Sequence, residues 1–369
     1  MAKLFMLFVV SLFSLASIAS AQNVLPSLDE LGDGWNVIKT GGVCSTGTPY
    51  QFYVKRRLGS NKLLIYFNGG GACWFGQQCD LKAKPNTHFP FANMKENDPR
   101  TASGLFAHDN VENPFVDYNM VSLPYCTGDV HMGAGKRTYA YTDATGKKVK
   151  VPTFHVGYKN STTVLYWVYK NFQSPQRIMV SGSSAGAIGS SFYSGLIAER
   201  YPSVPVVLLA DAAGGYNSPR LPVVFKAWNT ASILPDWKEY TGETNETLTF
   251  EDFYIASANH NKNLTIAQYN AAGDQVQINF NLLLGDPPDS FKIPQRIFHH
   301  YTEIESAVDT FYSYTPGGKV HTILRSPHFY TYKVEGIRFV TWLSDLAAGK
   351  PVGDISCVDE PQGCAAAPK

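Results

Sequence analysis

The chain has 369 residues, of which 44% are hydrophobic and 17% are charged, a composition typical of a globular protein with a large core. Its 31 basic and 30 acidic side chains leave a formal net charge of +1. A chain so close to neutrality gives no electrostatic reason to expect a nucleic acid or a charged membrane as partner, although local basic patches remain compatible with it.

The first 21 residues have the pattern of a secretory signal peptide. Lys3 supplies a positive charge, "LFMLFVVSLFSLASIA" an apolar segment, and Ala19–Ser20–Ala21 a small-residue cleavage site. The apolar run is too short and too close to the N-terminus to predict a membrane anchor. We expect cleavage before Gln22 and secretion of residues 22–369. No repeat or low-complexity linker divides this part, so we expect a single domain.

An even number of cysteines follows the predicted signal peptide, which indicates disulfides in an exported chain. The six are Cys44, Cys73, Cys79, Cys126, Cys357 and Cys364. The spacing favours local loops closed by Cys73 with Cys79 and by Cys357 with Cys364, which leaves the other two as a pair, but it does not exclude other connectivities. A zinc site is the competing interpretation, and no CxxC or HExxH spacing supports it. Glycosylation sequons begin at Asn160, Asn245 and Asn263.

Short apolar runs alternate with helical segments along the chain. Strand-like runs lie at 62–68, 118–125, 177–182, 204–211, 264–270 and 310–315. Helical candidates lie at 160–172 and 187–201, and residues 331–349 read as a last helix capped by Gly349. Near-continuous apolar strands that alternate with helices are typical of a buried parallel sheet, so the sequence predicts an α/β fold.

The segment "RIMVSGSSAGAIGSSF" contains the pattern G-x-S-x-G, with Ser184 between Gly182 and Gly186. The pattern suits a nucleophilic serine, because small residues permit the sharp strand-to-helix turn that lifts the hydroxyl above the sheet. The alternative is a plain small-residue turn. A dinucleotide-binding turn fits less well, since the glycine spacing is not G-x-G-x-x-G. The apolar run before the motif and the helical segment after it favour the nucleophile.

Three consecutive glycines in "LLIYFNGGGACW" follow a predicted strand upstream of Ser184. An α/β-hydrolase carries part of its oxyanion hole in the corresponding loop. Without side chains, the backbone N–H groups can approach a developing negative oxygen. We therefore predict Gly70, Gly71 and Ala185, the residue after the serine, as oxyanion-hole donors. The alternative is a flexible turn clamped by two neighbouring cysteines.

A serine nucleophile needs an acid and a base, which follow it in that order in this fold. Asp211 and Asp274 both end predicted strands after Ser184, and Asp274 is favoured because it lies on the later strand. Asp211 is then a pocket or structural residue. His321 follows a Gly-rich turn after the last strand and is favoured as the base. His328, which directly follows a proline, is the alternative.

The segment "NPFVDYNMVSLPYCTGDVHMG" contains Asp129 and His131. The structural interpretation is a strand, a disulfide and a turn in which the aspartate bonds backbone N–H groups. The functional interpretation places both residues at the rim of the pocket, in contact with substrate. The sequence leaves both interpretations open.

Together these segments resemble the pectin acetylesterase family, which includes the Notum carboxylesterases. The resemblance rests on "NGGGACW", "NPFVDYNMVSLPYCTGDVHMG", "VSGSSAGAIGS", "AGDQVQINF" and "VHTILRSPHFYT", and it extends from about Cys44 to Gly349. It implies an α/β-hydrolase fold and a carboxylesterase with Ser184, Asp274 and His321 as its triad. One feature departs from the Notum pattern, because Gly71–Ala72 stand where Notum-like members have a bulky aromatic residue.

The resemblance implies a secreted serine esterase that removes acetyl groups from plant cell-wall pectin or a related polysaccharide, with no metal or organic cofactor. A Notum-like deacylase of a lipid-modified protein is the second interpretation, and it requires a deep apolar pocket beside the serine. The third is a non-catalytic carbohydrate-binding protein that retains the fold. The sequence does not indicate an oligomeric state.

Overall fold

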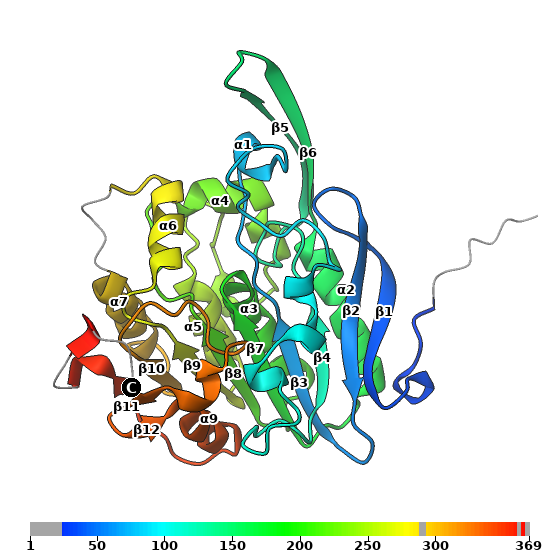
Figure 1. Cartoon of the computed structure of the whole chain (residues 1–369), viewed down its shortest axis with the longest axis vertical. Helices are drawn as coiled ribbons and strands as arrows, with labels where there is room; N and C mark the ends of the chain where they lie inside the picture. The colour runs from blue at the N-terminus through cyan, green and yellow to red at the C-terminus, as the bar shows by residue number, and fades with distance from the viewer. Residues whose placement is uncertain (1–23, 288–292, 360–362, 366–369) are drawn as a thin grey trace, which may run out of the picture.

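A large, mostly parallel sheet organises the protein in a computed structural model that describes residues 24–287, 293–359 and 363–365 (Figure 1). The predicted signal peptide, residues 1–21, lies outside these residues. The sheet has the strand order β1-β2-β4-β3-β7-β8-β9-β10-β13. Strand β2 runs antiparallel to both of its neighbours, and the other adjacent pairs are parallel. No helix within the described ranges is long and apolar enough to cross a membrane.

The six predicted strands are confirmed and form the central part of this sheet. They correspond to β3 (Lys62–Phe67), β4 (Asn119–Leu123), β7 (Arg177–Ser183), β8 (Val206–Asp211), β9 (Leu264–Tyr269) and β10 (Phe311–Thr315). Every residue of β4 and β8 is buried. Their apolar runs are continuous because helices and loops cover both faces of the sheet.

The strand side chains alternate between two apolar cores, one on each face of the sheet. Leu63 and Ile65 of β3 pack with helices α2, α3, α5 and α7, whereas Leu64 and Tyr66 pack with α8 and α9. The helix bounds are α1 (Gly76–Cys79), α2 (Gly157–Asn171), α3 (Ala185–Arg200), α4 (Leu221–Trp228), α5 (Glu251–His260), α6 (Gln275–Leu284), α7 (Ile293–Glu305), α8 (His328–Thr331) and α9 (Phe339–Ala347). The two helices predicted at 160–172 and 187–201 are confirmed as α2 and α3.

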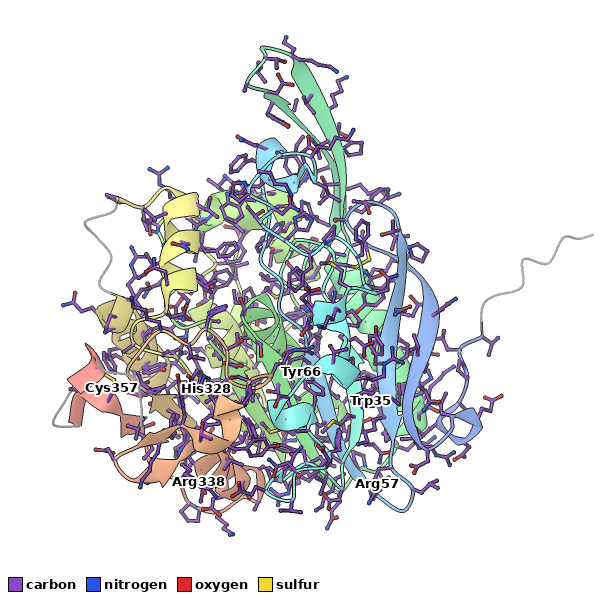
Figure 2. The ribbon with its side chains drawn as sticks, viewed as in Figure 1. Trp35, Arg57, Tyr66, His328, Arg338 and Cys357 are labelled. Atoms are coloured by element: carbon purple, nitrogen blue, oxygen red, sulfur yellow. A yellow bond between two sulfur atoms is a disulfide. The ribbon has the colours of Figure 1, made fainter. Side chains whose placement is uncertain are left out.

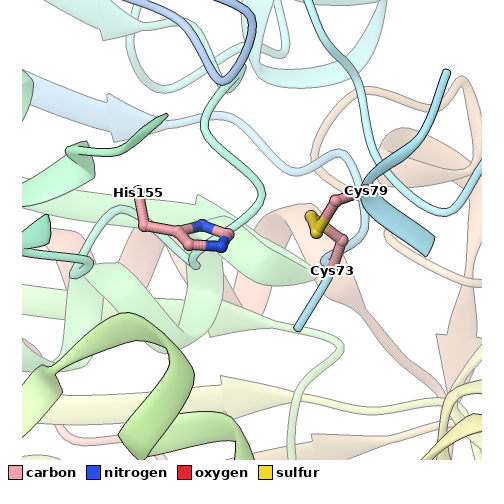
Figure 3. A group of neighbouring side chains, drawn as sticks. All are labelled: Cys73, Cys79 and His155. Atoms are coloured by element: carbon pink, nitrogen blue, oxygen red, sulfur yellow. A yellow bond between two sulfur atoms is a disulfide. The ribbon is translucent and has the colours of Figure 1, made fainter. Parts of the chain in front are cut away.

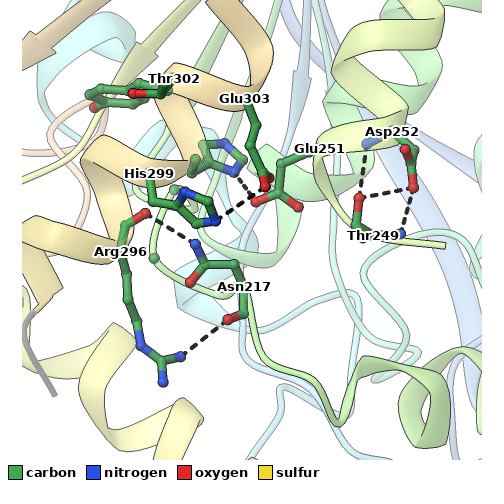
Figure 4. A network of polar contacts seen from close by, with 12 residues as sticks. Asn217, Thr249, Glu251, Asp252, Arg296, His299, Thr302 and Glu303 are labelled. Carbon is green, nitrogen blue, oxygen red and sulfur yellow. Dashed lines mark hydrogen bonds and ion pairs between the residues drawn. The ribbon is translucent and has the colours of Figure 1, made fainter. Parts of the chain in front are cut away.

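Buried polar contacts join α5 to α7 on the first of these faces (Figure 4). Glu251 in the first turn of α5 lies 2.6 Å from His300 Nδ1 on α7. Thr249, just before α5, donates its backbone N–H to Asp252 at 2.6 Å. These contacts satisfy polar groups at a packed helix junction, as burial requires.

The remaining strands were not predicted. A hairpin of β1 (Gly34–Val43) and β2 (Pro49–Arg56) extends the sheet at one edge, and β13 (Ile355–Ser356) closes the other. Strands β5 (Gly135–Thr142) and β6 (Lys148–His155) form a separate hairpin that projects from the body (Figure 1).

The prediction of one helix over 331–349 is wrong in its first half. Residues there form a tight hairpin of β11 (Lys333–Val334) and β12 (Ile337–Arg338), and α9 starts only at Phe339. Glu335 and Gly336 turn the hairpin with positive φ values of 51° and 79°. This conformation is that of a two-residue hairpin loop and excludes a continuous helix. Gly349 follows α9 with φ 75°, as predicted for a helix end.

Three disulfides join the cysteines in the pairs favoured by their spacing. Cys44 pairs with Cys126, Cys73 with Cys79, and Cys357 with Cys364. The first pair links the end of the β1–β2 hairpin region to the loop after β4. The second lies directly after the triple-glycine loop and therefore fixes one end of the candidate site.

Candidate active site

Ser184 occupies a sharp turn between β7 and α3. Its φ of 53° and ψ of −121° are unusual for a residue with a side chain, and it is the N-cap of α3. Its backbone N–H donates to the Asp211 carbonyl at 2.7 Å, which anchors the turn to β8. Strain of this kind persists only where the surrounding structure holds it, and it is the geometry expected of a nucleophile at such a turn. The residue keeps 8% exposure.

The glycines around Ser184 allow backbones to come close together. A Cβ on Gly182 would collide with the Gly186 carbonyl, and one on Gly186 would collide with the Phe67 carbonyl of β3. A Cβ on Gly69 would meet the Ser183 carbonyl. The G-x-S-x-G pattern and the triple glycine are therefore needed for the same junction, where the β3 loop lies against the β7–α3 turn.

His321 and Asp274 lie side by side after the carboxyl ends of β10 and β9. His321 Nδ1 is 2.6 Å from Asp274 Oδ2, and the aspartate side chain is fully buried while that of the histidine keeps 16% exposure. Because a carboxylate only accepts hydrogen bonds, Nδ1 carries the hydrogen and Nε2 is left as the basic nitrogen. Asp274 also accepts the backbone N–H groups of Val276 and Gln277 at the start of α6. These bonds fix the orientation of its carboxylate.

Asp211 contacts the same loop but not the imidazole. Its carboxylate accepts the backbone N–H groups of Ile323 and Leu324, each at 3.0 Å. It also accepts the Ser183 hydroxyl at 2.8 Å, and Tyr66, near the centre of the molecule in Figure 2, donates to that hydroxyl at 2.9 Å. Burial raises the pKa of Asp211 to about 6. The structure thus places Asp274 at the histidine ring and Asp211 at the loop backbone.

His328, the alternative base, begins α8 and is exposed (Figure 2). Its ring lies 4.6 Å from that of Tyr332, and it does not line the cleft described below. His321 and not His328 therefore lines the same cleft as Ser184.

The backbone N–H groups of Gly70, Gly71 and Ala185 face no protein acceptor within the described residues. The loop around them is held by the bonds from Ala72 N to Thr87 O and from Phe89 N to Gly70 O, at 2.9 and 2.8 Å. Gly71 has φ 78°, and a Cβ there would collide with the Thr87 carbonyl. A rigid loop with unpaired N–H groups can bind an oxygen that carries negative charge.

Ser184 lies between a large cleft and a small pocket. The cleft has a volume of about 670 Å³, and His321 and the three loop glycines line it together with the serine. The pocket has a volume of about 40 Å³ and shares Gly71, Ser184 and Phe280 with the lining of the cleft. Its walls are mainly apolar and include Ala72, Trp74, Ala185, Tyr216, Leu221, Trp228, Phe250 and Phe280.

Tyr216 was not singled out in the sequence. It is buried in the wall of the small pocket, which Ser184 also lines. Burial raises the pKa of this phenol, so it stays neutral. It follows "ADAAGG" after β8, and no local pattern distinguishes it from the many other tyrosines of the chain.

The rim position considered for Asp129 and His131 is wrong, because both side chains are buried and neither lines the cleft. Asp129 accepts the Thr127 hydroxyl and the N–H of Gly157 at the start of α2. His131 Nε2 lies 2.8 Å from the carbonyl of Asn68, just before the triple glycine. Burial raises the pKa of Asp129 to about 6 and lowers that of His131 to about 4. Both residues support loops behind the site, as in the structural interpretation.

The side chains of Cys73, Cys79 and His155 meet in one buried cluster (Figure 3). Among the described residues, it is the one group of potential metal ligands with at least three members close together. The two sulfurs are joined in a disulfide, and the ring nitrogens of His155 contact Tyr139 Oη and Thr127 O. The cluster therefore offers no free set of ligands in this state.

The mostly parallel sheet, the strained serine turn after β7 and the aspartate and histidine after later strands define an α/β-hydrolase fold. A sequence model of the family described as Pectinacetylesterase matches residues 35–221, about half of the chain. The chain belongs to this family.

Relatives are also found among characterised proteins. The palmitoleoyl-protein carboxylesterase NOTUM of Homo sapiens is 27% identical over 189 residues, which cover 48% of this chain and 35% of that protein. The Mus musculus protein of the same name is 28% identical over 189 residues, or 48% of this chain and 34% of that protein. The inactive palmitoleoyl-protein carboxylesterase notum1b of Danio rerio is 30% identical over 104 residues, which cover 28% of this chain and 74% of that protein. The chain spans about a third of the length of the human and mouse relatives.

Proposed function

We propose that the protein is a serine carboxylesterase that hydrolyses acetyl esters of pectin or a related polysaccharide. One observation carries the proposal: Ser184 lies at the junction of an acetyl-sized apolar pocket and a cleft large enough for sugar residues. Membership of the pectinacetylesterase family supports the same substrate class.

In the first step, His321 Nε2 takes the proton of the Ser184 hydroxyl, and the serine oxygen attacks the ester carbonyl carbon. Asp274 holds the imidazole by the hydrogen on Nδ1 and stabilises the imidazolium that forms. The imidazolium then gives its proton to the leaving sugar oxygen, and the acetyl group remains on the serine.

Negative charge develops on the carbonyl oxygen during this step. The N–H groups of Gly70, Gly71 and Ala185 are the donors that would stabilise it, because they are unpaired and held in place by neighbouring bonds. In the second step, His321 removes a proton from water, which attacks the acetyl carbon and releases acetate. Ser184 regains its proton, so atoms and charges balance over the cycle.

The size of the small pocket supports a short acyl group. A volume of about 40 Å³ is well below the roughly 150 Å³ of an apolar cavity that takes up benzene. A pocket of this size suits a short acyl group such as acetyl better than a long fatty acyl chain. Ala72 lines the pocket where Notum-like members have an aromatic residue, but Trp74, Trp228 and Phe280 fill the remaining space.

The relatives favour a second candidate, the deacylation of a lipid-modified protein, because the human protein is named as a palmitoleoyl-protein carboxylesterase. This activity would require the pocket walls to open well beyond the volume seen here. The inactive relative supports the third candidate, a non-catalytic homologue. Against it, the serine, aspartate, histidine and unpaired N–H groups are all present.

The three disulfides and the N-terminal pattern support secretion.

The acyl specificity can be tested with aryl esters of increasing chain length, from acetyl to octanoyl. We expect kcat/KM to be highest for acetyl or propionyl and at least about tenfold lower for octanoyl, because the longer chain cannot enter the pocket. Acetate release from acetylated pectin and acetylated xylan then identifies the polymer, with Ser184→Ala as the blank. A preference for octanoyl esters would favour the lipid deacylase instead.

A further inference from the structure

The projecting β5–β6 hairpin has two different faces. Tyr139, Tyr141, Val149 and Val151 point to one face and pack around the Cys73–Cys79 disulfide. The strand register places a second set of side chains on the opposite face. This set comprises Lys136, Thr138, Ala140 and Thr142 from β5 and Lys148, Lys150, Pro152 and Phe154 from β6. All are exposed except the half-buried Phe154. We call this second set the outer face.

The outer face carries positive charge without compensation. Lys136, Lys148 and Lys150 form no ion pair with any residue in the described part of the chain, and the face includes no acidic side chain. Lys136 lies 4.8 Å from the centre of the Phe154 ring, which holds its amine near the sheet surface. Residues 135–155 contain five basic residues and one acidic residue, in a chain whose net charge is only +1.

The three amines lie in a row. Lys148 and Lys150 are separated by about 7 Å along β6, and Lys136, opposite Phe154, lies about 14 Å further along, at roughly 3.4 Å per residue. The side chains between them are small or flat, so an extended chain can lie across the face without obstruction.

Contacts from both ends of β5 fix the hairpin to the body of the protein. Arg137 donates from Nε and Nη2 to the carbonyls of Ala227 and Lys226 at 3.0 and 2.7 Å. Tyr141 donates to Asp80 at 2.8 Å. Helix α1, which packs against both strands, lies between two segments that line the cleft, Gly69–Gly71 and 85–90. The hairpin is therefore joined, through α1, to the loops of the cleft.

We propose that the outer face binds the backbone of a polyuronate, the acidic polysaccharide that carries the acetyl esters. This proposal rests on the proposed function for the identity of the polymer. A polyuronate presents one carboxylate per sugar along an extended chain, which complements a row of unpaired amines on a flat surface. Binding at the hairpin would keep the polymer attached while successive sugars enter the cleft.

The test replaces all three lysines in Lys136→Gln/Lys148→Gln/Lys150→Gln. The control is Lys39→Gln/Lys262→Gln/Lys333→Gln, which removes the same charge from exposed lysines that also lack an ion pair within the described ranges. Binding to polygalacturonate without acetyl groups is measured by affinity electrophoresis at low and high salt, beside neutral galactan and duplex DNA. Turnover of an aryl acetate and of acetylated pectin is measured for the same proteins.

We expect the hairpin variant to bind polygalacturonate roughly tenfold more weakly than wild type at low salt and the control variant to bind normally. The KM for acetylated pectin should rise by a similar factor, with aryl-acetate turnover unchanged. Equal binding by the two variants would overturn the proposal, and so would DNA binding as tight as that of polygalacturonate, which would indicate a general polyanion surface. Wild-type protein without aryl-acetate turnover would contradict the esterase function and leave the polymer-binding result interpretable.

Discussion

Two buried aspartates bind different parts of the loop that carries His321. Asp274 contacts the His321 ring, whereas Asp211 binds the backbone of the loop two and three residues further on, at Ile323 and Leu324. Asp211 ends a parallel strand and Asp274 follows one. The sequence alone could therefore predict that the two aspartates lie near each other, but not which of them contacts the histidine ring. The distinction depends on how the loop after β10 folds back over the sheet, which no local pattern encodes.

The two positions should respond differently to removal of the charge. Asp274→Asn is expected to lower kcat for an aryl acetate by about 10³–10⁴-fold, because the amide favours the wrong imidazole tautomer. Asp211→Asn keeps an acceptor for the loop and is expected to lower kcat by only about tenfold. Steady-state kinetics of both variants, with circular dichroism as a control for folding, checks this order. A larger loss in Asp211→Asn would assign the triad acid to Asp211.

Asp211 is also expected to make the free energy of unfolding depend on pH. Burial raises its pKa from the ordinary 3.8 to about 6, so the folded protein binds this proton more tightly than the unfolded chain. The free energy of unfolding is therefore expected to fall as pH rises from about 4 to 6, by up to about 3 kcal/mol for this group. Urea unfolding across this range should show the slope in wild type and a weaker slope in Asp211→Asn. Identical slopes would show that Asp211 does not titrate in this way.

At the level of elements, the strands that form the centre of the sheet were predictable and those at its edges were not. Runs such as Ile178–Val180 are continuously apolar because both faces are buried, which distinguishes them from loops. The β5–β6 hairpin is polar on one face, so its sequence lacks the continuous apolar run of a central strand. The prediction of a helix through Lys333–Arg338 was wrong because Glu335 and Gly336 form a turn. The apolar periodicity of α9 obscured this turn in the sequence.

The triple-glycine loop gives a prediction about one element. Gly71→Ala places a Cβ against the Thr87 carbonyl at a positive φ, so the loop must move and its N–H groups with it. We expect kcat to fall by about 10²-fold or more. Gly59→Ala is the control, since Gly59 has φ 75° with open space around the added atom. It should lose some stability but little activity in the same aryl-acetate assay. Normal kcat in Gly71→Ala would argue against a catalytic role for this loop.

For the whole molecule, the topology explains why distant motifs converge. The turns after β7, β9 and β10 all lie at the carboxyl edge of the parallel sheet, which brings Ser184, Asp274 and His321 to one region. The convergence of these residues could be predicted once the strands were recognised in the sequence. The volume of the pocket could not be predicted, because Trp74, Tyr216 and Phe280 come from separate loops and helices whose packing the sequence does not reveal.

The central claim is that Ser184 forms a covalent acyl-enzyme, and labelling with a serine-reactive aryl phosphonate tests it most directly. Mass spectrometry should locate the label on Ser184, and Ser184→Ala should retain less than about one per cent of aryl-acetate turnover with an unchanged melting temperature. Ser190→Ala, which removes a buried hydroxyl from α3, is the matched control and should keep both label and activity. A label on another residue, or substantial turnover by a folded Ser184→Ala protein, would contradict the account.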